Sequence, residues 1–221
     1  MLDKLNIDEA LRYMGRRGHD VSALMPTVEE CAEELLNAVK PAYIYKYFNI
    51  TTAEGGIEVN GTNLLLTGKD IVSHLEGCGG CVLLCATASA GADKLIRQYE
   101  AYDMTRAFIT DCLASSAVES ICNEVGEEIQ QKLAGRFTTW RFSPGYGDLP
   151  LSTSRDIITI LDAQKRIGLN FTESDMLVPS KSVTAVIGVS DGEIPRRRRG
   201  CESCNMYKTC TFRKGGERCE F

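Results

Sequence analysis

The chain has 221 residues, of which 43% are hydrophobic and 25% charged, and its formal net charge is −5. This composition is that of a folded domain long enough to bury a sizeable core. The acidic balance argues against general nucleic-acid binding, and no apolar run reaches the roughly 20 residues that a membrane-spanning helix needs. The start, MLDKLNIDEALRYMG, has acidic residues and lacks the apolar core of a secretory signal, so we expect a cytoplasmic protein.

The first 50 residues predict two helices and a strand. Apolar spacing indicates a short helix over residues 3–17, which ends at the glycines of GRRGH. A second helix is predicted over residues 27–39, where Thr27 and Glu30 have the spacing of a capping box and Pro41 marks the exit. The alternating, aromatic-rich segment AYIYKYFNI then predicts a strand.

The middle of the chain predicts a hairpin, a helix, a buried strand and a long helical region. GIEVNGTNLLL contains the Asn60-Gly61 pair that favours a tight hairpin turn. Residues 67–75 predict a helix, and the continuous apolar run CVLLCATAS after a glycine-rich break is typical of a buried strand. Residues 91–133 keep helical spacing, and we expect two helices there, the second of them in the core.

The last part of the chain predicts one more helix, a strand pair and a separate tail. Residues 154–167 have helical periodicity closed by Gly168. LVPSKSVTAVIGVS predicts a pair of strands or one bent strand with Pro179 at a turn. Few large apolar residues follow the polar linker DGEIPRRRRG. We therefore expect one domain over residues 1–190 and a small appendage over residues 191–221.

Ten cysteines are unusual for a chain of this length without an export signal, because cytosolic thiols are kept reduced. Four of them have the spacing Cys201-x2-Cys204-x5-Cys210-x8-Cys219. Four thiolates in a segment without a core of its own can be ordered by tetrahedral zinc or by an iron–sulfur cluster such as 4Fe-4S. We predict a metal centre there, with zinc and cluster both open, and a reduced tail without metal as the alternative.

The other cysteines carry weaker signals. Cys78-x2-Cys81 precedes a strand, whereas a thioredoxin-type pair follows a strand and opens a helix, so structural thiols are favoured. We expect the isolated Cys31, Cys112 and Cys122 to pack in the core as small hydrophobic side chains.

Residues 141–151, RFSPGYGDLPL, form a stiff loop with some features of a binding site. Its prolines and glycines restrict the chain and let the backbone approach a ligand closely. Arg141 has a planar fork of donors suited to a carboxylate, and Tyr146 has an aromatic face and a hydroxyl. Backbone amides near Gly145 could bond a polar ligand. On these residues alone, a structural turn is the simpler interpretation.

In its context this loop resembles the activation domain of cobalamin-dependent methionine synthase. That family has an Arg-x-x-x-Gly-Tyr motif, then a helix, then a Gly-x-x-x-Thr-Glu-Ser segment followed by Met, Pro and a Ser-Val strand. The matching positions are Arg141, Gly145, Tyr146, Gly168, Thr172, Glu173, Ser174, Met176, Pro179, Ser182 and Val183. The resemblance covers roughly residues 5–190. It implies an α+β fold, with a bent antiparallel sheet and helices packed on it.

The resemblance also implies a ligand. In the family, the domain binds S-adenosylmethionine and presents its methyl group to an inactive cob(II)alamin, which is reduced by one electron and remethylated. By position, Arg141 would pair with the methionine carboxylate, and Glu119 would bind the methionine ammonium or lie near the sulfonium. The residues that would line the rest of the site are Ser143, Pro144, Gly145 and Tyr146.

The sequence shows no corrinoid-binding Asp-x-His-x-x-Gly segment, so the resemblance places cobalamin on a partner, a methionine synthase or another corrinoid protein. The reaction also needs an electron donor such as flavodoxin or ferredoxin, and a cluster on the tail cysteines could relay the electron or dock its donor. The family's acidic ligand near the N-terminus cannot be placed from the sequence. Beyond residue 190, SDGEIPRRRRG replaces a segment that carries a tyrosine in the family.

Two other functions stay open at this point. A non-catalytic, metal-bearing docking protein could keep this fold without binding S-adenosylmethionine. A regulatory or nucleic-acid-binding protein could use residues 196–199, RRRR, together with a zinc knuckle, although the acidic net charge counts against it. The leading prediction is an S-adenosylmethionine-binding activation module.

Overall fold

A computed structural model describes residue 2 and residues 4–15, 21–194 and 209 of the chain. Its elements, in chain order, are α1 (Ile7–Tyr13), the short 3-10 helix η1 (Ser22–Leu24), α2 (Met25–Ala38), β1 (Ala42–Ala53), β2 (Gly56–Val59), β3 (Leu65–Thr67), α3 (Lys69–His74), β4 (Gly80–Thr87), α4 (Ala90–Glu100), α5 (Met104–Lys132), β5 (Phe137–Thr138), α6 (Thr153–Ile160), α7 (Ala163–Ile167), β6 (Asn170–Phe171), β7 (Leu177–Val178) and β8 (Ser182–Ser190).

One antiparallel sheet organises these elements. Its six strands have the order β3-β2-β1-β4-β8-β5, and every neighbouring pair is antiparallel. The long strand β1 pairs with β4 along its first part and with β2 along its last four residues. β6 and β7 form a separate two-stranded ribbon. The expected α+β fold with an antiparallel sheet and flanking helices is confirmed.

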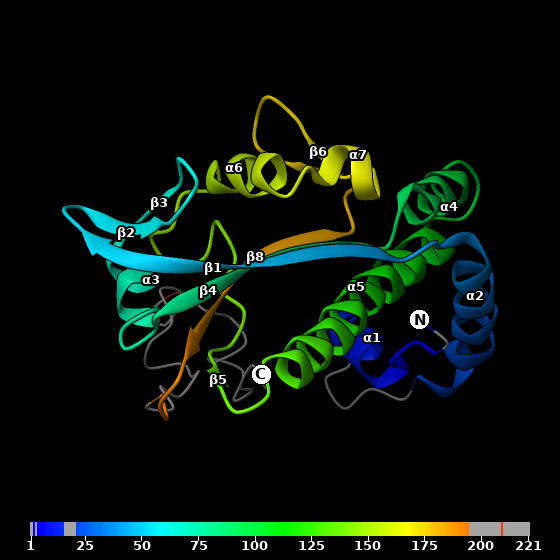
Figure 1. Ribbon diagram of the computed structural model, residues 1–221. Coiled ribbons are helices and arrows are strands. Elements are labelled where there is room, and N and C mark those ends of the chain that lie inside the picture. Colours follow the sequence, from blue (N-terminus) through cyan, green and yellow to red (C-terminus); the bar gives the residue numbers. More distant parts are fainter. Residues whose placement is uncertain (1, 3, 16–20, 195–208, 210–221) are drawn as a thin grey trace.

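Helices cover both faces of the sheet (Figure 1). On one face α1, α2, α4 and α5 enclose a core that includes Val82, Leu84 and Ala86 of β4. On the other face α3, α6 and α7 enclose a second core, which includes Leu83 and Cys85. Successive side chains of a strand point to opposite faces, so β4 is buried on both sides, as its continuous apolar sequence predicts.

Two helix predictions are wrong in detail. α2 begins at Met25 with Leu24 as its N-cap and no side-chain cap, so Thr27 lies inside the helix and makes no capping box. The 3-10 turn η1 and a proline in the first turn start this helix instead. The single helix expected over residues 154–167 is two helices, because Asp162 between them is left-handed (φ 52°, ψ 37°) and a right-handed helix cannot continue through it.

Several other local predictions are confirmed. The segment LVPSKSVTAVIGVS does contain two strands, β7 and β8, but β7 pairs with β6, and β8 pairs with β4 and β5. β2 and β3 form the hairpin around Asn60-Gly61, and two separate helices, α4 and α5, occupy the region of residues 91–133. Cys31, Cys112 and Cys122 are buried as expected. No helix among the residues described here is both long and apolar enough to cross a bilayer.

The Cys78–Cys81 pair has the character of structural thiols. Cys81 is buried and Cys78 half-buried, and both are free. Burial raises the pKa of both, that of Cys81 to about 12, so both stay protonated at neutral pH. Reactive cysteines need the thiolate form, and the structure therefore supports the structural interpretation.

Candidate functional site

A cavity of about 400 Å³ lies beside the β5 edge of the sheet, between α1, the middle of α5 and the segment that follows β5. Its walls carry charged, aromatic and small side chains from parts of the chain far apart in sequence. The lining residues are Glu9, Arg12, Tyr13, Glu119, Asn123, Trp140, Arg141, Ser143, Tyr146 and Val183.

Arg141 reaches this cavity because of the strand-like path of its segment. The Thr139 amide donates to the Gly188 carbonyl at 2.9 Å, and Phe142 and Val186 exchange backbone hydrogen bonds at 2.9 and 2.8 Å. Phe142 is buried in the core on the α3 and α6 face. In extended backbone the neighbouring side chain points the opposite way, so Arg141 is directed toward α5.

The Arg141 guanidinium is held by two side chains one turn apart on α5. It donates to the Glu119 carboxylate at 2.8 Å and to Asn123 Oδ1 at 2.9 Å. The Arg141 side chain is 20% exposed and that of Glu119 40%, so the ion pair faces the cavity without being sealed off. This pair joins two residues singled out in the sequence, and a ligand carboxylate at Arg141 would share or replace these acceptors.

An aromatic wall stands beside this ion pair. The Trp140 and Phe142 rings are 5.3 Å apart and inclined by 30°, and Tyr146 meets both edge-on at 5.9 and 5.4 Å. His74 packs against Trp140 at 4.4 Å and bonds Thr139 at 2.8 Å. Interlocked rings of this kind give a stiff apolar surface. Sequence reasoning missed Trp140, although its place directly before Arg141 was a usable signal.

The loop after Arg141 is closed by its own hydrogen bonds. The Tyr146 amide donates to the Ser143 carbonyl at 3.1 Å, and the Gly145 amide donates to the Leu149 carbonyl at 2.9 Å. The turn itself therefore uses the amides of Gly145 and Tyr146, two of those that the sequence offered to a polar ligand. Gly145, with φ 86°, supplies the left-handed turn.

The predicted loop residues divide between two adjacent cavities. Ser143 and Tyr146 line the cavity of Arg141. Pro144 lines a second cavity of about 280 Å³, which shares Ser143 and Val183 with the first. Gly145 is among the lining residues of neither. The structure thus brings Glu119, Arg141, Ser143 and Tyr146 together in one cavity and leaves Pro144 and Gly145 outside its lining.

The second half of the loop is fastened to the start of α3. Asp148 accepts the backbone N–H groups of Lys69 at 2.6 Å and Asp70 at 3.0 Å. These hydrogen bonds hold the pKa of Asp148 below its usual value. Gly147 has φ 58°, and a Cβ there would lie 2.4 Å from Asp70 Oδ2, so only glycine lets the two segments approach this closely.

α1 supplies the opposite wall of the Arg141 cavity. Glu9 accepts from Arg12 at 2.7 Å and from the Tyr13 hydroxyl at 2.7 Å. Burial, and then the bond to Glu9, raises the pKa of Tyr13 to about 12. Sequence reasoning missed these three residues, since no local motif connects them with α5 or with Arg141. Glu9 brings an acidic side chain from the N-terminal region to the site.

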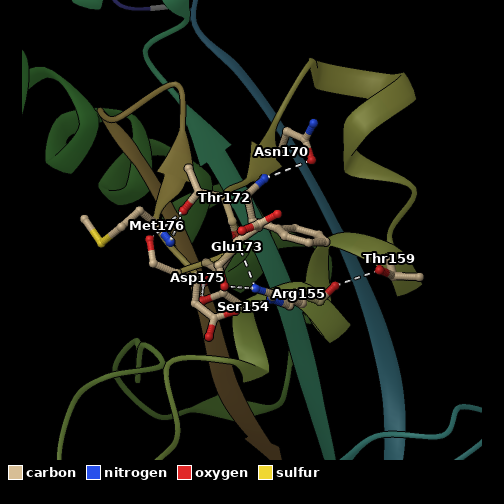
Figure 2. Close-up of polar contacts among 11 residues, drawn as sticks. Ser154, Arg155, Thr159, Asn170, Thr172, Glu173, Asp175 and Met176 are labelled. Atoms are coloured by element: carbon tan, nitrogen blue, oxygen red, sulfur yellow. Dashed lines mark hydrogen bonds and ion pairs between the residues drawn. The ribbon is translucent and has the colours of Figure 1, made fainter.

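The Thr-Glu-Ser segment of the sequence motif lies in the turn that joins β6 to β7 (Figure 2). Arg155 of α6 donates to the Asp175 carboxylate and to the carbonyls of Thr172, at 3.1 Å, and Glu173. Its guanidinium also lies over the Phe171 ring at 4.9 Å. Asp175, Met176 and Leu177 also line the second cavity.

The predicted metal site falls outside the described residues. Cys201, Cys204, Cys210 and Cys219 all belong to that part of the chain, and the metal centre stays a prediction. Within residues 2, 4–15, 21–194 and 209, the structure has no group of three or more His, Cys, Asp or Glu side chains placed to hold a metal ion.

Known proteins resemble this chain both in sequence and in fold. Residues 67–192, more than half of the chain, match the family described as vitamin B12 dependent methionine synthase, activation domain. No curated protein matches the sequence. Among solved structures, a crystal structure of the MetH reactivation domain bound to AdoHcy is similar, with a TM-score of 0.61 and 16% sequence identity over 89% of this chain and 73% of that chain. At this identity the likeness shows a shared fold.

Proposed function

This chain belongs to the family of the vitamin B12 dependent methionine synthase activation domain, and from that premise we propose that it binds S-adenosylmethionine in the Arg141 cavity. The observation that carries the proposal is the ion pair of Arg141 with Glu119, 2.8 Å apart, in the wall of a cavity of about 400 Å³. Both residues lie within the segment that matches the family.

The ion pair is complementary to an amino acid. A methionine moiety carries a carboxylate, which suits the planar donor fork of Arg141, and an ammonium group, which suits Glu119. Both protein groups are already held in position by α5, so binding would exchange partners without ordering new side chains. The aromatic wall of Trp140 and Tyr146 would carry the apolar part of the ligand.

We propose that the bound methyl donor serves a corrinoid protein. The partner would be a cobalamin-binding methionine synthase or a related corrinoid methyltransferase, and a flavodoxin or ferredoxin would supply the electron. The corrinoid contributes the methyl-accepting cobalt, and this chain contributes binding, orientation and a fixed electrostatic environment. We place this activity in the cytoplasm, where the six free thiols among the described residues would stay reduced.

The test of the binding site uses a reporter that the chain contains. Trp140 is the only tryptophan of the sequence and lines the cavity, so ligand binding should change its fluorescence, and calorimetry gives the affinity independently. We expect Arg141→Ala to weaken S-adenosylmethionine binding about 100-fold, roughly 2.7 kcal/mol, because a charged hydrogen-bond partner of the ligand is lost. Arg141→Lys should fall between, since it keeps the charge but loses the fork.

Arg97→Ala is the matched control, because Arg97 is an exposed arginine on α4 outside the cavity. It should leave the affinity unchanged. If the wild-type chain does not bind S-adenosylmethionine, the proposal fails and a non-catalytic docking protein becomes the better explanation. Binding that Arg141→Ala leaves intact would put the site elsewhere.

For the tail we propose a metal centre on Cys201, Cys204, Cys210 and Cys219 that relays the electron or docks its donor. The support for it is the spacing of four thiolates in a sequence poor in large apolar residues. We expect protein purified without oxygen to carry iron and sulfide and to lose both when two of these cysteines are changed to serine. A colourless protein that contains zinc would contradict the electron relay.

A further inference from the structure

The charged groups of the proposed S-adenosylmethionine cavity balance one another. Among the residues that the structure describes, those lining the cavity include two carboxylates and two guanidiniums: Glu9, Glu119, Arg12 and Arg141. Each carboxylate lies within hydrogen-bond distance of a guanidinium, at 2.7 Å for Glu9 with Arg12 and 2.8 Å for Glu119 with Arg141. The described lining therefore has a net charge of zero, and neither negative charge stands alone.

The contacts of α1 keep Arg12 charged and Tyr13 neutral at neutral pH. Burial opposes the charge of Arg12, but the hydrogen bond and charge of Glu9 outweigh it, and the pKa of Arg12 is raised. Tyr13 bonds the same carboxylate as a neutral phenol. The wall from α1 thus contributes one cation, one anion and one neutral donor.

This balance of charge affects how the cavity distinguishes the ligand before and after methyl transfer, because the transfer removes the positive charge on sulfur. S-adenosylmethionine has a sulfonium, whereas S-adenosylhomocysteine, the product that remains when the methyl group leaves, has an uncharged thioether and is otherwise the same. A cation is attracted to a cavity by its net field, and the attraction of a carboxylate is largely cancelled by a guanidinium within 3 Å of it. With no net charge, the described part of the lining gives the sulfonium little advantage over the thioether.

We infer that this cavity does not select for the sulfonium, and that Arg12, by pairing with Glu9, is a specificity-determining residue. S-adenosylmethionine and S-adenosylhomocysteine then bind within about threefold of each other, and the product competes for the site after each methyl transfer. The inference rests on the proposed function. It adds a residue, Arg12, that sets the preference between the sulfonium and the thioether form of the ligand.

The experiment measures a ratio of two affinities. Wild type, Arg12→Gln and Glu9→Gln are each titrated with both ligands by calorimetry and by Trp140 fluorescence. Arg12→Gln leaves Glu9 without its cation, so the ratio should shift about three- to tenfold toward S-adenosylmethionine. Glu9→Gln leaves Arg12 without its anion, and the ratio should shift by a similar factor toward S-adenosylhomocysteine.

The ratio cancels every contact that the two ligands share, including that of the carboxylate, and any loss of stability that affects both. Tyr13→Phe is the matched control: it removes a hydrogen bond to Glu9 but no charge, and should leave the ratio unchanged. The two shifts should also shrink at high salt, because these side chains are partly exposed.

The outcomes separate this inference from the proposed function. A wild-type preference of more than tenfold for S-adenosylmethionine would overturn the inference and leave the function standing. Ratios that Arg12→Gln and Glu9→Gln leave at the wild-type value would overturn the role of Arg12. If the chain binds neither ligand, the proposed function fails and the inference fails with it.

Discussion

Arg141 and Arg155 both lie in the segment that matches the family, and both bind several acceptors, yet those acceptors differ in kind. Arg141 donates to two side chains of α5, Glu119 and Asn123, at the wall of a cavity. Arg155 donates to two main-chain carbonyls and one carboxylate of the turn that joins β6 to β7, and it also covers the Phe171 ring.

The difference separates a binding role from a scaffold role. Side-chain partners on a helix can turn toward a ligand while the helix keeps its own backbone hydrogen bonds. A main-chain carbonyl cannot turn away without moving the backbone. An isolated two-stranded hairpin is only marginally stable in water, so the β6–β7 ribbon depends on contacts such as these. Arg141 can therefore exchange its partners for a ligand, whereas Arg155 holds the ribbon in place.

The largest effect that would test this comparison is on stability. We expect Arg155→Ala to lower the free energy of unfolding by about 2 kcal/mol, because three acceptors lose a charged donor. For a chain of this size, that corresponds to a fall in Tm of roughly 4–8 °C by calorimetry. The affinity for S-adenosylmethionine, measured below the transition, should change less than threefold, since Arg155 is not among the residues that line the Arg141 cavity.

Arg166→Ala on α7 is the control for this substitution, because Arg166 is exposed and close to Arg155 in sequence. It should move Tm by less than about 1 °C, as surface substitutions usually do. The comparison would break if Arg155→Ala abolished ligand binding while leaving Tm unchanged, since Arg155 would then belong to the site.

The elements of this fold that depend on neighbouring residues could be predicted from the sequence. The apolar run of β4, the Asn60-Gly61 turn and the helical spacing of α5 each depend on nearby residues, and each is confirmed. The errors are also local: the left-handed Asp162 has no strong signal, because aspartate is compatible with either a helix or a break.

The site is a different matter, because it is assembled from distant segments. Glu119 and Arg141 are 22 residues apart, and only the family resemblance linked them before the structure did. Glu9 and Arg12 come from α1, a helix of seven residues near the N-terminus. No sequence pattern predicts that this helix packs on α5. Periodicity predicts which face of an element is buried, but not which element will lie opposite.

The smallest effect concerns how the loop after Arg141 is fastened to α3, and it depends on pH. Asp148 joins the binding loop to α3, and its pKa is lowered in the folded state by the amides of Asp70 and Lys69. A lowered pKa means that the stabilisation is present above the unfolded pKa, about 3.9, and is lost as pH falls through the folded pKa.

We expect Asp148→Asn to lower Tm at pH 7, and the difference in Tm from wild type to shrink steadily from pH 5 toward pH 2. Asp191→Asn is the control, since that exposed carboxylate pairs with a side chain, Arg136, at 2.8 Å. The effect should be small because Asp148 is at the surface, where water competes for the same amides. A Tm difference that stayed constant with pH would show that the aspartate fastens the loop by its shape rather than by its charge.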